Sequence, residues 1–326
     1  MTTAVYVQKR TIVKPVAILY RLVRQRSRLV AMCAFVHLAA AAPAIAQSVP
    51  EGTEAAAVTP VVHEDDDAVL RPAEPDFVVV NLPTTLRLPR FRSNFRITHR
   101  FAGNLRNGTL GQQASNLFGI DQGAIIGFEY RFAVARYLQA AFYRSSFDKT
   151  IQLHGKYDAV QQRGSMPISL SPLLSIEGTD NFQEKYAPAA GVVISRQFGT
   201  RIAGYVTPMW AHNTAASLEV IDHDHDGGAY TESSDPSHVN RNTTYIGLGG
   251  RVRLGSSTYV AGEIAIRVRG YAPDQHGYGV SIEKRVGAHL FSMTFTNTFA
   301  TTFAQLARGG GANSLFLGFN LGRKFF

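Results

Sequence analysis

The feature that most constrains the fold is a two-residue alternation of apolar and polar side chains, which persists from about residue 91 to the last residue. In the segment GAIIGFEYRF, Phe128 and Tyr130 fall on one face, whereas Glu129 and Arg131 fall on the other. Because successive side chains of a β-strand point to opposite faces, this pattern predicts strands with one apolar face. Twelve segments carry it: residues 93–101, 123–132, 135–146, 149–160, 165–177, 186–198, 201–213, 241–254, 257–270, 277–286, 288–299 and 314–326.

The connections between these segments distinguish a soluble sandwich from a membrane barrel. Every second connection is short, namely residues 133–134, 161–164, 199–200, 255–256 and 287. Four of the six alternate connections are long, namely residues 104–122, 178–185, 213–240 and 300–313. Short turns on one side and long loops on the other, with an even number of strands, are typical of bacterial outer-membrane barrels. We therefore expect an all-β fold, a transmembrane antiparallel up-and-down β-barrel of about 12 strands spanning residues 91–326.

The first 46 residues have the composition of a signal peptide. Four arginines between residues 21 and 28 precede an apolar stretch at residues 29–42, and the small-x-small sequence Ala44-Ile45-Ala46 follows it. An uncleaved membrane anchor is the alternative, but the apolar stretch is short and ends in small residues. We expect export through this leader to the cell outer membrane.

Removing residues 1–46 changes the charge of the chain. The leader carries seven of the 33 Lys and Arg residues and no acid, so 26 basic residues face 24 acidic ones, a net charge of +2. A nucleic-acid partner therefore lacks its electrostatic basis. The single cysteine, Cys33, leaves with the leader, which excludes a disulfide framework, a thiolate metal site and a cysteine nucleophile in the mature chain.

Residues 47–90 are rich in Ala, Pro, Val and acidic residues, with the run HEDDD at residues 63–67 and six prolines. Such a composition does not support a hydrophobic core of its own, so it predicts a disordered periplasmic linker or arm. Two further interpretations remain open. Residues 77–82, FVVVNL, are a candidate short docking strand, and the acidic run is a candidate partner-binding patch.

Several stretches resemble an uncharacterised bacterial family of outer-membrane β-barrel proteins. They are residues 116–124 (NLFGIDQGA), 143–150 (YRSSFDKT), 155–157, 195–199, 295–297 and 318–323 (GFNLGR). The resemblance covers nearly all of residues 95–325, and the stretch RSSFDKT is fairly specific to it. It implies the barrel fold and the location but no settled activity, so no catalytic residue is carried over.

The inward face should then carry any function. By alternation, its charged candidates are Glu129, Arg131, His154, Lys156, Arg251, Arg253, Glu263, Arg267, Arg269, Glu283 and Arg285. Opposite charges can pair across a small lumen and fill it, which gives a structural barrel. Alternatively, the lumen is a narrow, mildly cationic passive channel for small anionic or neutral solutes. Arginine outnumbers acid on the last five predicted strands, so we expect any selectivity to favour anions.

One loop contains a cluster of metal-ligand residue types: Asp222, His223, Asp224, His225 and Asp226. Alternating Asp and His offers oxygen and nitrogen ligands, but the spacing fixes no coordination geometry. A ligand- or metal-binding surface barrel is therefore an alternative, beside a plain solvated loop. No cofactor is expected.

A hydrolase at the outer rim is a less favoured alternative. Ser145, Ser146, Asp148, His154 and His212 supply suitable residue types, but no motif such as GxSxG marks a nucleophile. The two serines and the aspartate lie at a tight outer turn, where both residue types are ordinary turn formers. We expect that the protein is not an enzyme.

The chain ends in the alternating stretch LFLGFNLGRKFF. This stretch predicts a closing strand that pairs with residues 95–101 and places Phe319, Leu321 and Phe325 toward lipid. By the same alternation, Phe326 is not on the lipid face. These four residues are the candidate signal for the barrel assembly machinery, which is an expected partner together with outer-membrane lipid.

Overall fold

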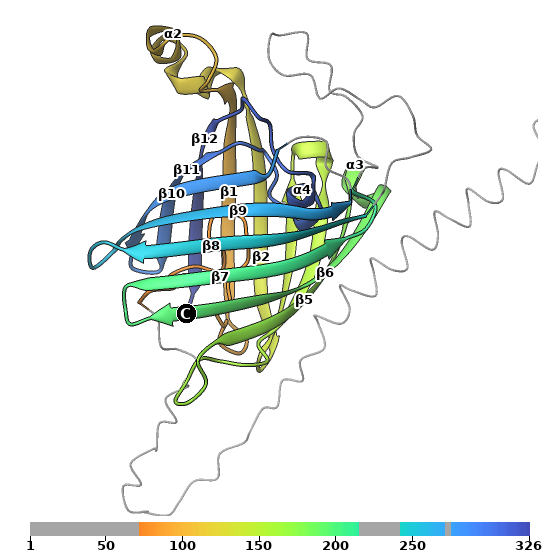
Figure 1. Ribbon diagram of the computed structural model, residues 1–326, viewed down its shortest axis with the longest axis vertical. Helices are drawn as coiled ribbons and strands as arrows, with labels where there is room; N and C mark the ends of the chain where they lie inside the picture. Colours follow the sequence, from red (N-terminus) through yellow and green to blue (C-terminus); the bar gives the residue numbers. More distant parts are fainter. Residues whose placement is uncertain (1–71, 215–241, 271–274) are drawn as a thin grey trace, which may run out of the picture. The chain divides into compact units, whose positions relative to one another are not determined.

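The computed structural model describes residues 72–214, 242–270 and 275–326, and within these ranges twelve antiparallel strands form a closed barrel (Figure 1). Each strand pairs with its sequence neighbours, and the first strand closes on the last. The strands are β1 (Ser93–Asn104), β2 (Ala124–Ala135), β3 (Leu138–Ser145), β4 (Ile151–Tyr157), β5 (Ser169–Gly178), β6 (Glu184–Phe198), β7 (Ile202–Ala211), β8 (Thr243–Arg253), β9 (Thr258–Gly270), β10 (Gly277–Val286), β11 (His289–Thr296) and β12 (Phe316–Phe325). The predicted fold class and all twelve predicted strands are confirmed.

Short helical segments lie between the strands. They are α2 (Leu110–Ser115), η1 (Leu117–Gln122), η2 (Phe147–Lys149), α3 (Thr179–Phe182) and α4 (Phe303–Arg308). Within the described ranges, the longest of these helices has six residues, and none is long and apolar enough to cross a membrane. The predicted leader, the first part of the predicted linker up to residue 71, and the Asp/His-rich loop lie outside the described residues.

The two faces of the barrel wall have opposite character. On β2, Phe128 and Tyr130 are 46% and 49% exposed on the outer face, whereas Glu129 and Arg131 are buried on the inner face. The same alternation holds along β3, β7 and β10. An apolar exterior around a polar interior is the arrangement of a barrel that spans a membrane, so the predicted faces are confirmed.

The last strand closes the barrel as predicted. β1 and β12 pair antiparallel, with Phe95 opposite Arg323 and His99 opposite Phe319. The outward ring of Phe319 stacks on His99 at 4.8 Å between ring centroids. Phe325 is exposed on the same outer face. The proposed role of the terminal aromatics in assembly stays a prediction.

One predicted lumen residue lies on the opposite face. On β9, Arg267 pairs with Tyr245 and Arg269 pairs with Thr244, so one extra residue, Val268, sits in a bulge. The bulge reverses the alternation, and Arg269 is exposed. The prediction that Arg269 faces the lumen is therefore wrong, because a β-bulge shifts every later side chain to the other face.

The second half of the predicted linker is not disordered. Residues 73–88, which we call the N-terminal plug, fold inside the barrel as a hairpin-like turn (orange in Figure 1). Val79 N–H donates to the Leu82 carbonyl at 2.8 Å, and Thr84 N–H donates to the Phe77 carbonyl at 2.9 Å. Every residue of this plug is buried except Arg87, which is half-buried. The predicted docking segment therefore docks, but as a turn rather than as a strand.

A second segment also enters the lumen. Residues 298–313, which we call the inner loop, lie between β11 and β12, and residues 300–313 were expected to form a long outer loop. Instead, they carry α4 into the barrel, with Phe303, Ala304, Leu306 and Ala307 all buried (Figure 1). The polar barrel interior is thus occupied by two segments of the same chain.

Candidate functional site

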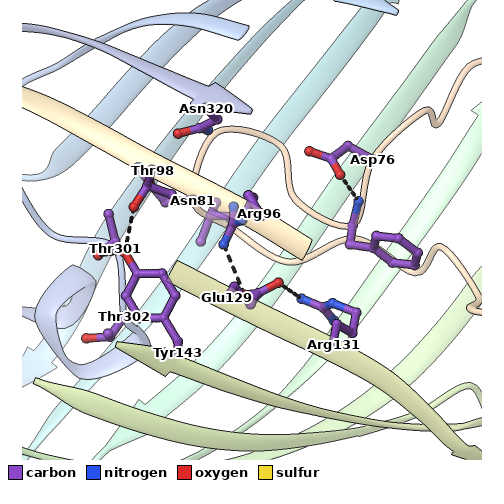
Figure 2. A network of polar contacts seen from close by, with 12 residues as sticks. Asp76, Asn81, Arg96, Thr98, Glu129, Arg131, Tyr143, Thr301, Thr302 and Asn320 are labelled. Atoms are coloured by element: carbon purple, nitrogen blue, oxygen red, sulfur yellow. Dashed lines mark hydrogen bonds and ion pairs between the residues drawn. The ribbon is translucent and has the colours of Figure 1, made fainter. Parts of the chain in front are cut away.

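The lumen wall carries charges that are already paired with one another. The Arg96 guanidinium and the Arg131 guanidinium each contact the Glu129 carboxylate at 3.0 Å, which forms a buried Arg-Glu-Arg group (Figure 2). On the opposite wall, Arg251 donates to both oxygens of Glu283 at 2.9 and 3.0 Å. Removing either partner of such a pair would be strongly destabilising, because it would leave an uncompensated charge in a low-dielectric interior.

Glu263 holds the turn of the N-terminal plug. Its carboxylate accepts the backbone N–H groups of Val80, Asn81 and Leu82, with the shortest distance to each being 2.9 Å. Three successive amides that converge on one carboxylate form an anion-binding concavity, and here the anion belongs to the barrel wall. Among the described residues, these bonds account for the turn amides that no internal hairpin bond uses.

The carbonyl groups of the same turn have their own donors. Arg251, which is paired with Glu283, also donates to the Val78 carbonyl at 2.7 Å. The Asn320 side chain donates to the Val80 carbonyl at 3.1 Å, and the Arg100 guanidinium donates to the Asn81 side chain at 2.9 Å. Donors from three different strands therefore fix the turn in one orientation.

The second arm of the plug is held by Lys156. Its ammonium donates to the carbonyls of Thr84 and Leu86 at 2.8 Å each, and it also contacts the Asp158 carboxylate at 3.2 Å. The Gln139 side chain donates to the same Leu86 carbonyl at 3.0 Å. Lys156 is thus a buried cation whose charge is neutralised by the wall and whose remaining protons bind the plug.

Glycines hollow the wall where the apolar side chains of the plug lie. A Cβ added at Gly247 would lie 2.8 Å from a Leu82 methyl group, and one added at Gly249 would lie 3.0 Å from Val79. On β10, a Cβ at Gly279 would lie 3.2 Å from Val80 Cγ1. The absence of these side chains leaves room for the plug. The wall therefore matches the plug in shape as well as in hydrogen bonding.

The inner loop also forms hydrogen bonds with the wall. The Tyr143 hydroxyl lies 2.7 Å from the Thr98 hydroxyl and donates to the Thr301 hydroxyl at 2.7 Å (Figure 2). The Ala304 N–H donates to the Glu177 carboxylate at 3.3 Å. These contacts attach the start of α4 to β1, β3 and β5.

Part of the inner loop is buried in an apolar cluster. Phe303 and Leu306 belong to one buried cluster with wall residues such as Leu173 and Met209, and the cluster includes Leu82 of the plug. The Phe303 ring also meets the His154 ring edge-on, with 5.3 Å between centroids. The two segments that occupy the lumen therefore share one apolar contact region.

The predicted lumen residues divide into three groups. The structure brings seven of them into the buried wall around the two segments: Glu129, Arg131, His154, Lys156, Arg251, Glu263 and Glu283. Arg267 is half-buried and donates to the Arg308 carbonyl of α4. Arg253 and Arg285 are half-buried, and Arg253 donates to two carbonyls of its own turn. Only the first group and Arg267 contribute to the filled lumen.

Sequence reasoning missed three residues that hold the site, namely Arg96, Arg100 and Asn320. All three are buried and face inward. The signal was present, since the alternation of β1 and β12 places each of them on the polar face. The glycines at 247, 249 and 279 gave a weaker signal, because glycine also occurs in strands for other reasons.

The residues considered for a hydrolase are dispersed. The Ser145 and Ser146 hydroxyls accept backbone N–H groups at 3.1 and 2.9 Å, and Asp148 pairs with an arginine of α4 at 3.6 Å. His154 lies in the lumen, and His212 Nδ1 lies 2.6 Å from an asparagine side-chain oxygen. Within the described ranges, no hydrogen bond joins the Ser145 or Ser146 hydroxyl to either histidine, and no group of three potential metal ligands occurs.

A family model described as "Membrane bound beta barrel domain (DUF5777)" matches residues 76–325. Among solved structures, the chain is similar to the COG4313 outer membrane channel from Pseudomonas putida F1, with a TM-score of 0.43 and 10% identity over 73% of this chain and 97% of that one. It is also similar to the NanC porin, with a TM-score of 0.42 and 8% identity over 72% of this chain and 99% of that one.

A further similar structure is the outer membrane phospholipase A from Escherichia coli, with a TM-score of 0.40 and 9% identity over 78% of this chain and 98% of that one. At these identities, the likeness concerns the barrel fold alone. A search of curated protein sequences gave no match.

Proposed function

The chain belongs to the membrane bound beta barrel domain family, and we propose that it is a closed outer-membrane barrel whose own N-terminal plug and inner loop keep the lumen from conducting solutes. The observation that carries this proposal is the convergence of Val80, Asn81 and Leu82 on the Glu263 carboxylate. The Glu263 carboxylate stabilises the plug inside the lumen, because it would lose all three of these amide donors if the plug left.

Conductance in planar lipid bilayers tests this proposal. Purified full-length chain is refolded, and its heat-modifiable mobility on gels verifies that the barrel has formed. We expect no conductance steps above the bilayer background, because two segments with specific contacts occupy the lumen. Regular open steps from the folded, full-length chain would contradict the closed barrel.

A passive channel for small anionic or neutral solutes is the second candidate. It is favoured by the polar nature of the plug contacts, since Glu263, Arg251 and Lys156 can all be solvated by water if the plug leaves. In this case, the closed state described above is a resting state, and the plug is its gate. Such a channel would show rare openings in the full-length chain, with anions favoured.

A disulfide lock separates the two candidates. A Cβ at position 279 would lie 3.5 Å from the Val80 Cβ, which is within the range for a disulfide. We therefore propose the double variant Val80→Cys with Gly279→Cys in a chain that lacks the leader and its cysteine. Openings that disappear on oxidation and return on reduction would establish the channel. Silence in both redox states, with verified folding, would support the structural barrel.

We also propose that the protein is not a hydrolase and that it reaches the outer membrane through its leader. The serine hydroxyls at positions 145 and 146 are used as backbone acceptors, which supports the first statement. Lipid and peptide hydrolysis assays on the folded barrel test it, and activity that is lost in Ser145→Ala or Ser146→Ala would overturn it. N-terminal sequencing of the exported chain tests the expected cleavage after Ala46.

A further inference from the structure

A cavity of about 530 Å³ opens at the end of the barrel where the β8–β9 and β10–β11 turns meet the end of β12. The entry of the N-terminal plug forms part of its wall. The lining residues that matter here are Asp76, Asn94, Ser257, Arg285, Lys324 and Phe326. None of the contacts described above uses this cavity.

Among the described residues, Lys324 is a buried cation that forms no ion pair, although the Asp76 carboxylate lies on the same cavity. Its residue is 8% exposed and faces inward from β12. Its ammonium lies over two aromatic rings, 5.5 Å from the centroid of Phe77 and 5.9 Å from the centroid of Phe326. Such rings stabilise a cation only in part, and burial of an ammonium is costly without a paired anion.

Arg285 lies on the same cavity and differs from three arginines of the lumen that form ion pairs. Arg96, Arg131 and Arg251 each contact a carboxylate at 2.9 to 3.0 Å. Within the described ranges, the backbone N–H of Arg285 donates to the Ser257 carbonyl, but its guanidinium forms no hydrogen bond or ion pair. Its guanidinium therefore adds a second cationic group beside Lys324.

The other polar residues that line the cavity, Asp76 and Asn94, indicate which class of ligand it could bind. Asp76 is the one carboxylate among the lining residues, and its Oδ1 already accepts the Phe77 N–H at 2.8 Å. The Asn94 side-chain oxygen is buried and has no hydrogen-bond partner, so it offers an acceptor. Two cations together with one free acceptor suit an oxyanion that also carries an O–H group. Phosphate in its hydrogen phosphate form has both features.

We propose that this cavity is a phosphate-binding site in which Arg285 and Lys324 bind the anionic oxygens and Asn94 accepts the O–H. The ligand is free phosphate or the phosphate of a lipid head group, and the two share the same recognition chemistry. This site lies outside the plug contacts and goes beyond the proposed closed barrel, since it would exist in either a structural barrel or a channel.

Calorimetric titration of the full-length barrel with inorganic phosphate, in a phospholipid-free detergent, tests the site. We expect saturable binding that weakens by at least about tenfold in Lys324→Gln and in Arg285→Gln. Two matched controls lie beside them in sequence but face outward: Arg323→Gln, and Lys284→Gln, whose ammonium contacts Thr258 at 3.2 Å. Both controls should bind phosphate like the wild type.

Mass spectrometry of lipids retained from micelles that contain phosphatidylglycerol distinguishes the two sources. Retention by the wild type and both controls, with loss in the two site variants, would support a head-group phosphate. Phosphate titration without specific lipid retention would support the free anion. Absence of saturable phosphate binding in the folded wild type, or equal affinity in all four variants, would overturn the proposal.

Discussion

The N-terminal plug and the inner loop both occupy the lumen, but they are held by different kinds of contact. The backbone of the plug is bound by charged wall groups such as Glu263 and Lys156, while its apolar side chains are divided among three buried clusters. The inner loop places five residues, including Phe303 and Leu306, in a single buried apolar cluster. Water can hydrate the charged wall groups once the plug separates from them, whereas exposing the apolar cluster of the inner loop to water is unfavourable.

From this difference, we expect that two segments in one lumen can differ in how easily they separate from the wall. When the plug separates from the wall, water can hydrate its charged partners and so recover part of the free energy of those hydrogen bonds. An apolar interface loses its full burial free energy on separation. We therefore expect the plug to open locally before the inner loop does.

The largest expected effect comes from Glu263→Ala, which removes the acceptor of three plug amides. Since a hydrogen bond to a charged group contributes about 1.5–3 kcal/mol, we expect hydrogen exchange in peptides covering residues 78–84 to rise by about a hundredfold or more. Mass spectrometry measures this exchange. Glu184→Ala, an exposed glutamate at the start of β6, is the control. Unchanged exchange in Glu263→Ala would refute a plug held by this carboxylate.

Phe303→Ala tests the apolar side of the comparison. Truncation of a buried phenylalanine should lower the free energy of unfolding by about 3 kcal/mol or more, because it leaves a cavity in the cluster. Denaturant titration, followed through the fluorescence of the single tryptophan, Trp210, measures the change. The volume-conserving variant Phe303→Leu should lose less than about 1.5 kcal/mol.

The same variant also sharpens the distinction between the two segments. If Phe303→Ala increased plug exchange as strongly as Glu263→Ala does, the plug and the inner loop would form one cooperative unit rather than two. We expect a smaller increase, since the two segments share only the apolar contact region around Leu82.

The smallest effect is expected for Gly247→Ala. The new Cβ would lie 2.8 Å from a Leu82 methyl group, so the leucine must shift within a packed region. We expect the free energy of plug docking to fall by about 1 kcal/mol. This loss should raise hydrogen exchange of residues 78–84 roughly fivefold. Gly250→Ala on the same strand is the matched control, because no atom lies within 4 Å of its added Cβ. Equal effects of the two substitutions would show that the glycine at 247 does not shape the wall for the plug.

Part of the site could be predicted from residue patterns. Alternation placed Glu129, Arg251 and Glu263 in the lumen, and the structure has them there. The alternation gave the wrong face for Arg269. The bulge on β9 arises from its pairing with β8, and the sequence pattern of β9 alone does not show it. Alternation also could not identify the partner of Glu263, since the Val80 amide is 183 residues away in the chain.

The linker prediction failed for a related physical reason. Composition measures whether residues 73–88 could form a core of their own, and they could not. It does not measure whether a wall formed elsewhere supplies buried donors and acceptors for their backbone, or glycines that accommodate Val79 and Leu82. Segments that fold against another part of the chain are therefore easily mistaken for disordered ones.

By itself, the sequence determined the twelve strands, the polarity of their two faces and the closure of β12 on β1, because side-chain alternation and turn length are local properties of a strand. Only the tertiary structure decided what occupies the lumen. The choice between an open pore and a filled barrel depends on hydrogen bonds and packing between residues far apart in the chain. Those contacts bring residues 73–88 and α4 inside the wall.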